Sequence, residues 1–250
     1  MKIILAKNYE DLSKKSAEII VSQVKEKENS VLGLATGSTP IGMYKEIVKM
    51  HKNGQVSFGK VSTVNLDEYR GVDKENNQSY YYYMKEQIFK FIDINTKNTY
   101  IPNGMNENSD QECENYEKII ENLGGIDLQI LGIGHNGHIG FNEPAEEFSE
   151  KTYCVELDER TIQANARFFD SIEDVPKEAY TMGIGTIMSS KKILLLVSGQ
   201  SKADILYETV LGKTTPKIPS TILHEHENVT IIADEDALSK ILKEKPDIIK

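Results

Sequence analysis

Residues 30–51 read SVLGLATGSTPIGMYKEIVKMH and predict one unit of an α/β fold. The apolar run 30–35 is short enough for a buried strand. After the polar turn 36–39, residues 40–51 place apolar side chains at helical spacing, and the proline at position 40 suits the first turn of a helix. A strand that leads directly into an amphipathic helix is the building block of a parallel sheet covered by helices.

Apolar runs recur at five further places, most of them before an amphipathic stretch. They are hydrophobic on both faces, which is typical of parallel strands covered on both sides. The runs are MKIILA at 1–6, KVSTVNL at 60–66, GIDLQILGIG at 125–134, KKILLLVSG at 191–199 and NVTIIAD at 228–234. No internal repeat interrupts the pattern. We therefore predict a single domain over residues 1–250, a three-layer α/β/α fold around a mostly parallel, Rossmann-like sheet.

The composition limits the classes of partner. The net charge is −10 and the pI about 5.1, so a nucleic acid or an anionic membrane would be repelled without a clustered basic patch. Cys113 and Cys154 are far apart and form no CxxC pair, which argues against a disulfide framework or a zinc knuckle. The apolar start of the chain is too short for a signal sequence or a membrane span. We expect a soluble cytoplasmic protein.

Four polar clusters follow predicted strands, at 36–39, 67–68, 135–143 and 199–202. In an open α/β sheet, ligands bind beyond the carboxyl ends of the strands, where loops and helix N-termini converge. Each cluster alone could be a turn or a helix cap. Together they predict a ligand site at one edge of the sheet, whereas the tyrosine run 80–83 is expected to pack a helix or to form an interface.

The turn Thr36, Gly37, Ser38 and Thr39 is suited to an anion such as phosphate. Backbone N–H groups at the positive end of a helix would bind it together with the three hydroxyls. N-capping of the helix by Ser38 or Thr39 is the competing interpretation. The chain lacks GxxxxGK[ST], so the turn is not a nucleotide P-loop.

The loop GIGHNGHIGFNEP at 132–144 allows three interpretations. Its first six residues match the dinucleotide pattern GxGxxG, but Gly140, Asn142 and Pro144 interrupt the helix that should receive the pyrophosphate. A metal site could use histidines of the loop and its glutamate, with two more histidines at 224 and 226. No HExxH motif supports that site, and the histidines at 224 and 226 are expected on a solvated loop, so no metal is predicted.

An acid/base site is the third interpretation. It requires a histidine oriented by a second group with a carboxylate nearby, and His138, Asn136 and Glu143 provide these. Asp67, at its own strand end, offers a separate base. Acid/base groups beside a phosphate turn favour sugar-phosphate chemistry, with ring opening and proton abstraction next to a carbonyl. The residues alone do not distinguish an isomerase from a deaminase or a lactonase.

Five separated motifs, spread over nearly the whole chain, resemble the glucosamine-6-phosphate deaminase family. These are LGLATGSTP, NLDEY, GIGHNGHIGFNEP, ARFFD and SGQSKA. The resemblance implies isomerising deamination of glucosamine 6-phosphate with water to fructose 6-phosphate and ammonia, without metal or organic cofactor. A sugar-phosphate lactonase of the same superfamily and a non-catalytic sugar-phosphate sensor are the alternatives, and release of ammonia discriminates between them.

The resemblance also implies roles for individual residues. His138 would carry the proton in ring opening, with Glu143 and Asn136 completing its relay. Asp67 would move the proton from C2 to C1 through an enolamine. Many relatives have aspartate where this chain has Asn136, which puts the details of the relay in question and not the activity.

Phosphate contacts and assembly follow from the same resemblance. The phosphate would lie against the turn 36–39 and be paired by Arg167 and Lys202, with Arg167 in a mobile lid at about 158–178. Hexameric relatives are activated through basic residues after the NEP motif. Here residues 145–159 read AEEFSEKTYCVELDE and are rich in acids, so we expect a monomer or a small homo-oligomer.

Overall fold

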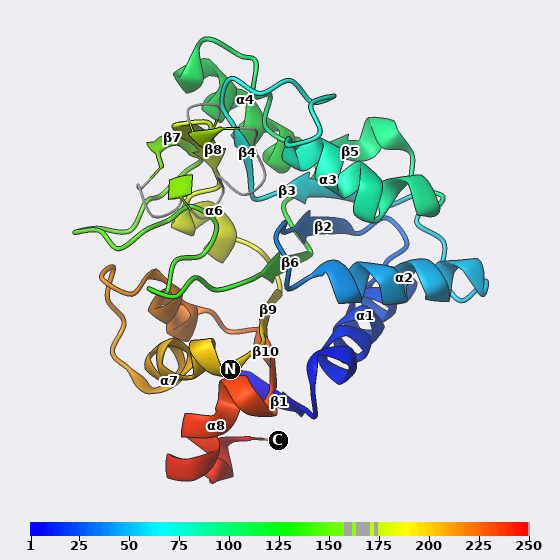
Figure 1. Ribbon diagram of the computed structural model, residues 1–250. Coiled ribbons are helices and arrows are strands. Elements are labelled where there is room, and N and C mark those ends of the chain that lie inside the picture. The colour runs from blue at the N-terminus through cyan, green and yellow to red at the C-terminus, as the bar shows by residue number, and fades with distance from the viewer. Residues whose placement is uncertain (158–161, 164–170, 173–174, 250) are drawn as a thin grey trace.

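The computed structural model describes residues 1–157, 162–163, 171–172 and 175–249. A seven-stranded sheet runs through its centre in the order β1-β10-β9-β6-β2-β3-β5 (Figure 1). Every neighbouring pair in this sheet is parallel, which confirms the predicted Rossmann-like architecture. The strands are β1 (Lys2–Ala6), β2 (Val31–Leu34), β3 (Ser62–Asn65), β5 (Thr99–Tyr100), β6 (Leu128–Leu131), β9 (Ile193–Val197) and β10 (Val229–Asp234).

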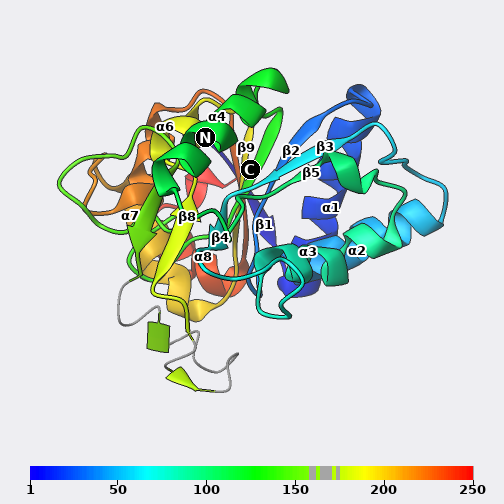
Figure 2. The same cartoon turned by 90° about the horizontal axis from the view of Figure 1, so that it is seen from above.

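Helices cover both faces of this sheet, and the view from above separates the three layers (Figure 2). One side carries α1 (Tyr9–Glu26), α2 (Ile41–Lys52) and α3 (Tyr80–Gln87). The other side carries α4 (Ser109–Asn122), α6 (Ile184–Met188), α7 (Ala203–Leu211) and α8 (Glu235–Glu244). Short 3₁₀ helices are also present: η1 (Phe89–Phe91), η2 (Thr96–Asn98), η5 (Gln200–Lys202), η6 (Pro219–Glu225) and η7 (Pro246–Ile248).

Local sequence signals explain where the helices begin. The side chain of Asn8 accepts a hydrogen bond from the backbone N–H of Asp11 and caps α1. Asp234 caps α8 in the same way, through the N–H of Ala237. Acidic residues in the first turn and lysines in the last turn of both helices complement the helix dipole.

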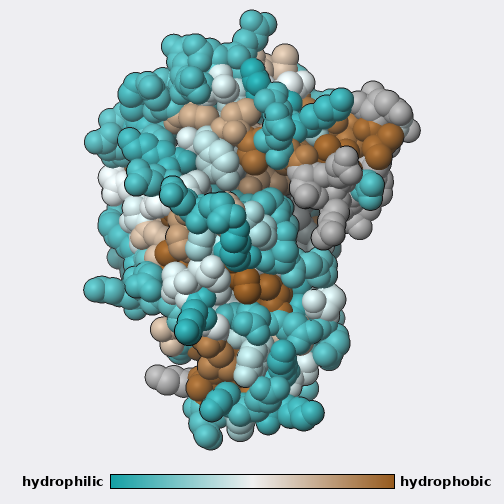
Figure 3. Space-filling view, turned by 90° about the vertical axis from the view of Figure 1, so that its left-hand side faces the viewer, coloured by the Kyte–Doolittle hydropathy of each residue, from teal (hydrophilic) through white to brown (hydrophobic). Residues whose placement is uncertain are grey.

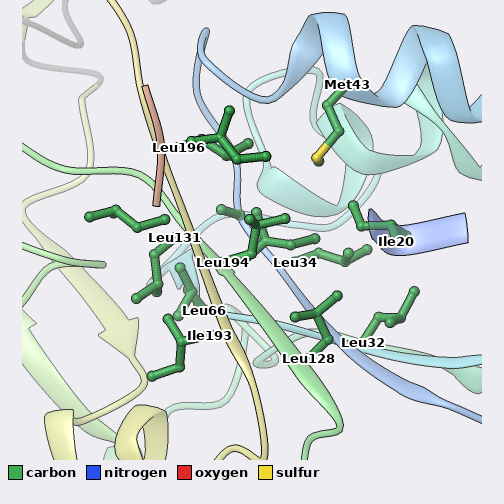
Figure 4. Close-up of a cluster of buried hydrophobic side chains, with 14 of the residues drawn as sticks. Ile20, Leu32, Leu34, Met43, Leu66, Leu128, Leu131, Ile193, Leu194 and Leu196 are labelled. Atoms are coloured by element: carbon green, nitrogen blue, oxygen red, sulfur yellow. The ribbon is translucent and has the colours of Figure 1, made fainter. Parts of the chain in front are cut away.

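The core lies between the sheet and the helices on either side (Figure 4). All five residues of β9 are buried, as expected for a parallel strand with both faces covered. Leu32 and Leu34 of β2 pack close to Leu128 of β6, and Ile20 of α1 and Met43 of α2 close the core from the helical side. The hydrophobic runs of the sequence therefore form the buried strands of the sheet.

The order in which strands are added to the sheet reverses between β2 and β6, although all these strands run parallel. After β2 the chain adds β3 and β5 toward one edge, and it then returns with β6 on the other side of β2. Gly33 permits this approach, because a Cβ at Gly33 would lie 2.0 Å from Oε1 of Gln129 on β6. Such a reversal point is where ligands bind in open α/β sheets.

A second, three-stranded sheet was not predicted. It is antiparallel, in the order β4-β8-β7, with β4 at Asp67–Tyr69, β7 at Tyr153–Glu156 and β8 at Glu178–Thr181. These strands are short and polar in sequence, so no hydrophobic run revealed them. A separate small cluster that includes Tyr69 and Phe141 packs against this sheet.

Hydrophilic side chains dominate the face seen in Figure 3, and apolar side chains gather there in separate areas. Among the described residues, no helix combines the length and the apolar character needed to cross a membrane.

Candidate active site

The four predicted polar clusters converge at one edge of the central sheet. They follow β3, β2, β6 and β9, which are consecutive neighbours in the sheet. Lys202 lies in η5 after β9, and its Nζ donates a hydrogen bond to the carbonyl of Ile133 in the loop after β6 at 2.9 Å. Burial lowers the pKa of Lys202. The prediction that these clusters share one edge is confirmed.

The turn after β2 leaves its backbone donors available. Gly37 has a φ of 95°, a left-handed conformation that glycine adopts without strain. Pro40 occupies the N-cap of α2, and the helix has no side-chain cap there, so the competing interpretation of N-capping by Ser38 or Thr39 is wrong. Within the described part of the chain, the N–H groups of Gly37, Ser38 and Thr39 donate to no protein acceptor. Such a turn can bind an anion through these groups.

The loop after β6 brings a histidine, a carboxylate and an amide together. Nδ1 of His138 lies 2.9 Å from Oε1 of Glu143. This distance suits an ion pair, but the two atoms are not aligned as a hydrogen bond, and Nδ1 has no aligned partner among the residues that the structure describes. Asn136 donates from Nδ2 to Oε2 of Glu143 at 2.6 Å, and its Oδ1 accepts from the backbone N–H of His138 at 3.2 Å. Asn136 therefore contacts the carboxylate and not the imidazole ring.

Electrostatics favour a charged Glu143. Burial raises the pKa of this carboxyl, but the contact with His138 and the amide of Asn136 outweigh burial and hold the pKa below its ordinary value. An ionised Glu143 can orient the imidazole and stabilise its protonated form.

A close glycine fixes the position of the imidazole. A Cβ at Gly134 would lie 2.3 Å from Nε2 of His138, so the ring lies directly against the backbone of Gly134. Gly132 in the same loop has open space at the corresponding position. The loop thus has one glycine that the ring requires and one that it does not.

Asp67 and its neighbour Glu68 are both buried in β4, but they face different surroundings. Glu68 accepts hydrogen bonds from the backbone N–H groups of Tyr69, Tyr80 and Tyr81, each at 2.9 Å, and so binds the start of α3. Oδ2 of Asp67 instead lies 3.6 Å from where a Cβ of Gly140 would stand, beside the loop after β6. Asp67, and not Glu68, is therefore the carboxylate of the pair that faces the loop after β6.

Burial, reinforced by the negative charge of Glu68, raises the pKa of Asp67 to about 8. Burial also raises the pKa of Glu68, to about 7, although its three backbone N–H donors oppose that shift. A carboxylate with a raised pKa is a stronger base than an ordinary aspartate once it is ionised.

Two residues that sequence reasoning missed hold the loop against the second sheet. Thr181, which pairs with Asp67 in the register of β4 and β8, accepts from the backbone N–H of Phe141 at 3.0 Å. Asn142 donates to the carbonyls of Ile139 and Met182, both at 2.9 Å. In the sequence Asn142 stands out only as a helix breaker, and no sequence signal marks Thr181.

The remaining predicted residues lie apart from this cluster or outside the described residues. Arg167 and most of the predicted lid at 158–178 fall outside the described residues. His135 and His224 are exposed. His226 is not on a solvated loop as predicted: its Nε2 lies 2.7 Å from the carbonyl of Ser190, and its Nδ1 accepts from the N–H of Asn228. Over the described ranges, no three His, Cys, Asp or Glu side chains are placed to hold a metal ion.

The model of the family described as glucosamine-6-phosphate isomerases/6-phosphogluconolactonase matches residues 6–232. The chain belongs to this family. Glucosamine-6-phosphate deaminase of Thermoanaerobacter sp. (strain X514) is 55% identical over 241 residues, which cover 96% of this chain and 95% of the relative. The enzyme of the same name from Geobacillus sp. (strain WCH70) is 56% identical over 245 residues, which cover 98% of each.

Solved structures of the family extend the comparison. A structure described as a monomeric glucosamine-6-phosphate deaminase matches with a TM-score of 0.93 and 46% identity, over 96% of this chain and all of that one. A 6-phosphogluconolactonase from Trypanosoma cruzi matches with a TM-score of 0.76 and 20% identity, over 96% of each chain. The second likeness shows that the fold is shared within the family.

Proposed function

We propose that this family member is a glucosamine-6-phosphate deaminase, which converts glucosamine 6-phosphate and water to fructose 6-phosphate and ammonia. The observation that carries the proposal is the pairing of His138 with Glu143 beside the buried Asp67 at the reversal point of the sheet. Relatives of that name at 55% identity support the proposal, whereas the likeness to lactonases is limited to the fold. A non-catalytic sensor would have no need of a buried aspartate with a raised pKa.

Ring opening is the first step of the proposed mechanism. His138 moves the proton between the hydroxyl on C1 and the ring oxygen, which breaks the bond from C1 to the ring oxygen and leaves an open-chain aldehyde. Glu143 stabilises the imidazolium that forms, and Asn136 holds Glu143 by its hydrogen bond.

Proton transfer between carbons is the second step. Asp67 takes the hydrogen from C2 as a proton, and the electron pair forms a double bond between C1 and C2. The C1 carbonyl opens and its oxygen takes a proton from water, which gives an enolamine. The same carboxyl returns the proton to C1, which gives an imine at C2. Water then adds to C2 and ammonia leaves, so the atoms of substrate and water are all accounted for in fructose 6-phosphate and ammonia.

The phosphate of the substrate binds the turn 36–39 in this proposal, through its free N–H groups and the hydroxyls of Thr36, Ser38 and Thr39. Lys202 and Arg167 add the positive charge by which an acidic protein binds an anion. Because a phosphorylated sugar remains in the compartment where it is made, we place the enzyme in the cytoplasm. We further propose a monomer or a small homo-oligomer, in line with the relative described as monomeric.

Lys202→Ala should chiefly raise KM for glucosamine 6-phosphate. The contact exists in the ground state and the transition state alike, so its loss weakens binding by about 1.5 to 3 kcal/mol and leaves kcat nearly unchanged. Steady-state kinetics measure both parameters. The penalty should disappear with unphosphorylated glucosamine, and an unchanged KM for the phosphorylated sugar would remove Lys202 from the site.

Gly134→Ala should lower kcat roughly 10- to 100-fold while the protein stays folded, because the new methyl group displaces the ring of His138. The φ of Gly134 is not in the left-handed region, so the backbone accommodates alanine. Gly132→Ala is the matched control, since it adds the same methyl group to open space in the same loop. Equal kcat values for the two variants would show that the position of this ring does not limit catalysis.

The pH dependence of kcat/KM should report Asp67. The base must be ionised, so kcat/KM should rise as the pH is raised through about 8. Glu68, Tyr69, Tyr80 and Tyr116 interact electrostatically with this carboxyl, and the negative charge of Glu68 helps to raise the pKa of Asp67. Glu68→Gln removes that charge, so the rise should move to lower pH in a pH–rate profile. A profile that keeps its midpoint in Glu68→Gln would exclude this coupling.

One assay tests the function itself. The purified chain is incubated with glucosamine 6-phosphate and, separately, with 6-phosphogluconolactone, while ammonia and lactone hydrolysis are followed. We expect ammonia and fructose 6-phosphate in equal amounts and no accelerated lactone hydrolysis. Lactone hydrolysis without ammonia would support the lactonase instead, and binding without turnover would support the sensor.

A further inference from the structure

Three tyrosine hydroxyls donate to backbone carbonyls of residues 35–39, the segment that contains the proposed phosphate turn. Tyr44 of α2 donates to the carbonyl of Ala35 at 2.6 Å, inside the core. Tyr83 of α3 donates to the carbonyl of Gly37 at 2.6 Å. Tyr9 of α1 lies 3.1 Å from the carbonyl oxygen of Ser38 and 3.0 Å from that of Thr39. Each tyrosine comes from a different helix on the same side of the sheet (Figure 2).

These contacts fix the direction of the N–H groups on the opposite side of each peptide. All described peptides are trans, and in a planar trans peptide the N–H points away from the preceding carbonyl. The carbonyl of Gly37, held by Tyr83, therefore directs the N–H of Ser38 away from α3. The carbonyl of Ser38, held by Tyr9, directs the N–H of Thr39 away from α1. Both N–H groups lack a protein acceptor in the described part of the chain.

Tyr9 has a second contact that ties the turn to the helix behind it. Its hydroxyl oxygen accepts from the backbone N–H of Gly42 in the first turn of α2 at 2.8 Å. Pro40 provides no side-chain cap for that helix, so the phenol of Tyr9 serves as its cap from a neighbouring helix. A phenol can accept one hydrogen bond and donate another, which a phenylalanine at this position cannot do.

The geometry points to Tyr9 and Tyr83 as positioning residues for phosphate: they hold the carbonyls of the turn so that the N–H groups of Ser38 and Thr39 face the phosphate of the substrate. The inference rests on the proposed function in placing phosphate at this turn. It gives the tyrosine-rich segment a role that helix packing alone does not explain. Burial raises the pKa of Tyr83, so its hydroxyl stays protonated and can donate.

Tyr9→Phe and Tyr83→Phe test the inference, because each removes one hydroxyl from a partly exposed ring and leaves the ring in place. Each should raise KM for glucosamine 6-phosphate roughly 3- to 10-fold and leave kcat nearly unchanged. Inhibition by inorganic phosphate should weaken by a similar factor. Tyr82→Phe is the matched control, since it lies on the same helix and its hydroxyl makes no hydrogen bond among the described residues.

Amide NMR with inorganic phosphate gives a readout that does not depend on turnover. In the parent, the Ser38 and Thr39 amide signals should shift on titration, and in both variants the midpoint should move to higher phosphate concentration. Thermal unfolding should stay close to that of the parent. Ammonia release with parental KM and parental phosphate inhibition in both variants would overturn the inference and leave the proposed function intact. A parent that releases no ammonia would overturn the proposed function, and the amide titration would then decide the role of the tyrosines by itself.

Discussion

Asp67→Asn is expected to slow ammonia release by roughly 10²- to 10⁴-fold or more, with substrate binding preserved. Asparagine keeps the shape of the side chain and part of its hydrogen bonding, but it lacks the oxygen that accepts the proton from C2. The effect should appear in kcat, measured by ammonia release at saturating glucosamine 6-phosphate. A variant with parental kcat would exclude Asp67 as the base.

A loss of activity in Asp67→Asn should not come from a loss of folding stability. The pKa of Asp67 in the fold, about 8, lies above the ordinary value of 3.8, so the folded state binds more protons than the unfolded state between these values. The carboxyl therefore lowers the free energy of unfolding progressively as the pH rises through that range. Asparagine, which stays neutral, removes this cost, so the variant should be at least as stable as the parent at neutral and alkaline pH.

His138→Asn is the second variant with a large expected effect. Ring opening needs a group that both accepts and donates a proton, and an amide cannot do so near neutral pH. We expect kcat/KM for glucosamine 6-phosphate to fall roughly 10²- to 10⁴-fold, measured by ammonia release at low substrate concentration.

His135→Asn is its matched control. The two histidines are three residues apart in one loop, but His135 is exposed, while His138 lies against Gly134 and beside Glu143. The control should keep parental activity. Equal losses in the two variants would show that the loop as a whole, and not the imidazole of His138, is required.

Sequence patterns predicted six of the seven strands of the central sheet, because parallel strands that are buried on both faces must be apolar throughout. The two-residue edge strand β5 (Thr99–Tyr100) has no such run and was not predicted. The run ILLLV of β9 is apolar at every position, and all five residues are buried. The same pattern placed the clusters after β2, β3, β6 and β9 at one edge, since the carboxyl ends of parallel strands meet there. The location of the candidate site, though not its geometry, could therefore be predicted from the sequence.

Contacts between distant segments could not be predicted in this way. The sequence gives no sign that Thr181 lies beside Asp67, or that Tyr9 caps α2 across a turn. The pattern NLDEY offered two adjacent carboxylates, and only the three backbone donors on Glu68 distinguish their surroundings. Local residue types predict which groups are available, whereas packing decides which of them meet.

Exchange of the C2 hydrogen in deuterated water tests the central claim most directly. Glucosamine 6-phosphate is incubated with the parent, Asp67→Asn and Glu68→Gln, and loss of the C2 proton signal is followed by NMR together with ammonia. We predict that the parent loses the C2 hydrogen and releases ammonia. Glu68→Gln should also exchange the C2 hydrogen and release ammonia, with a shifted pH profile. In Asp67→Asn, both exchange and ammonia release should be much slower than in the parent. Parental exchange and deamination in Asp67→Asn, with Glu68→Gln inactive, would contradict the account and assign the base to Glu68.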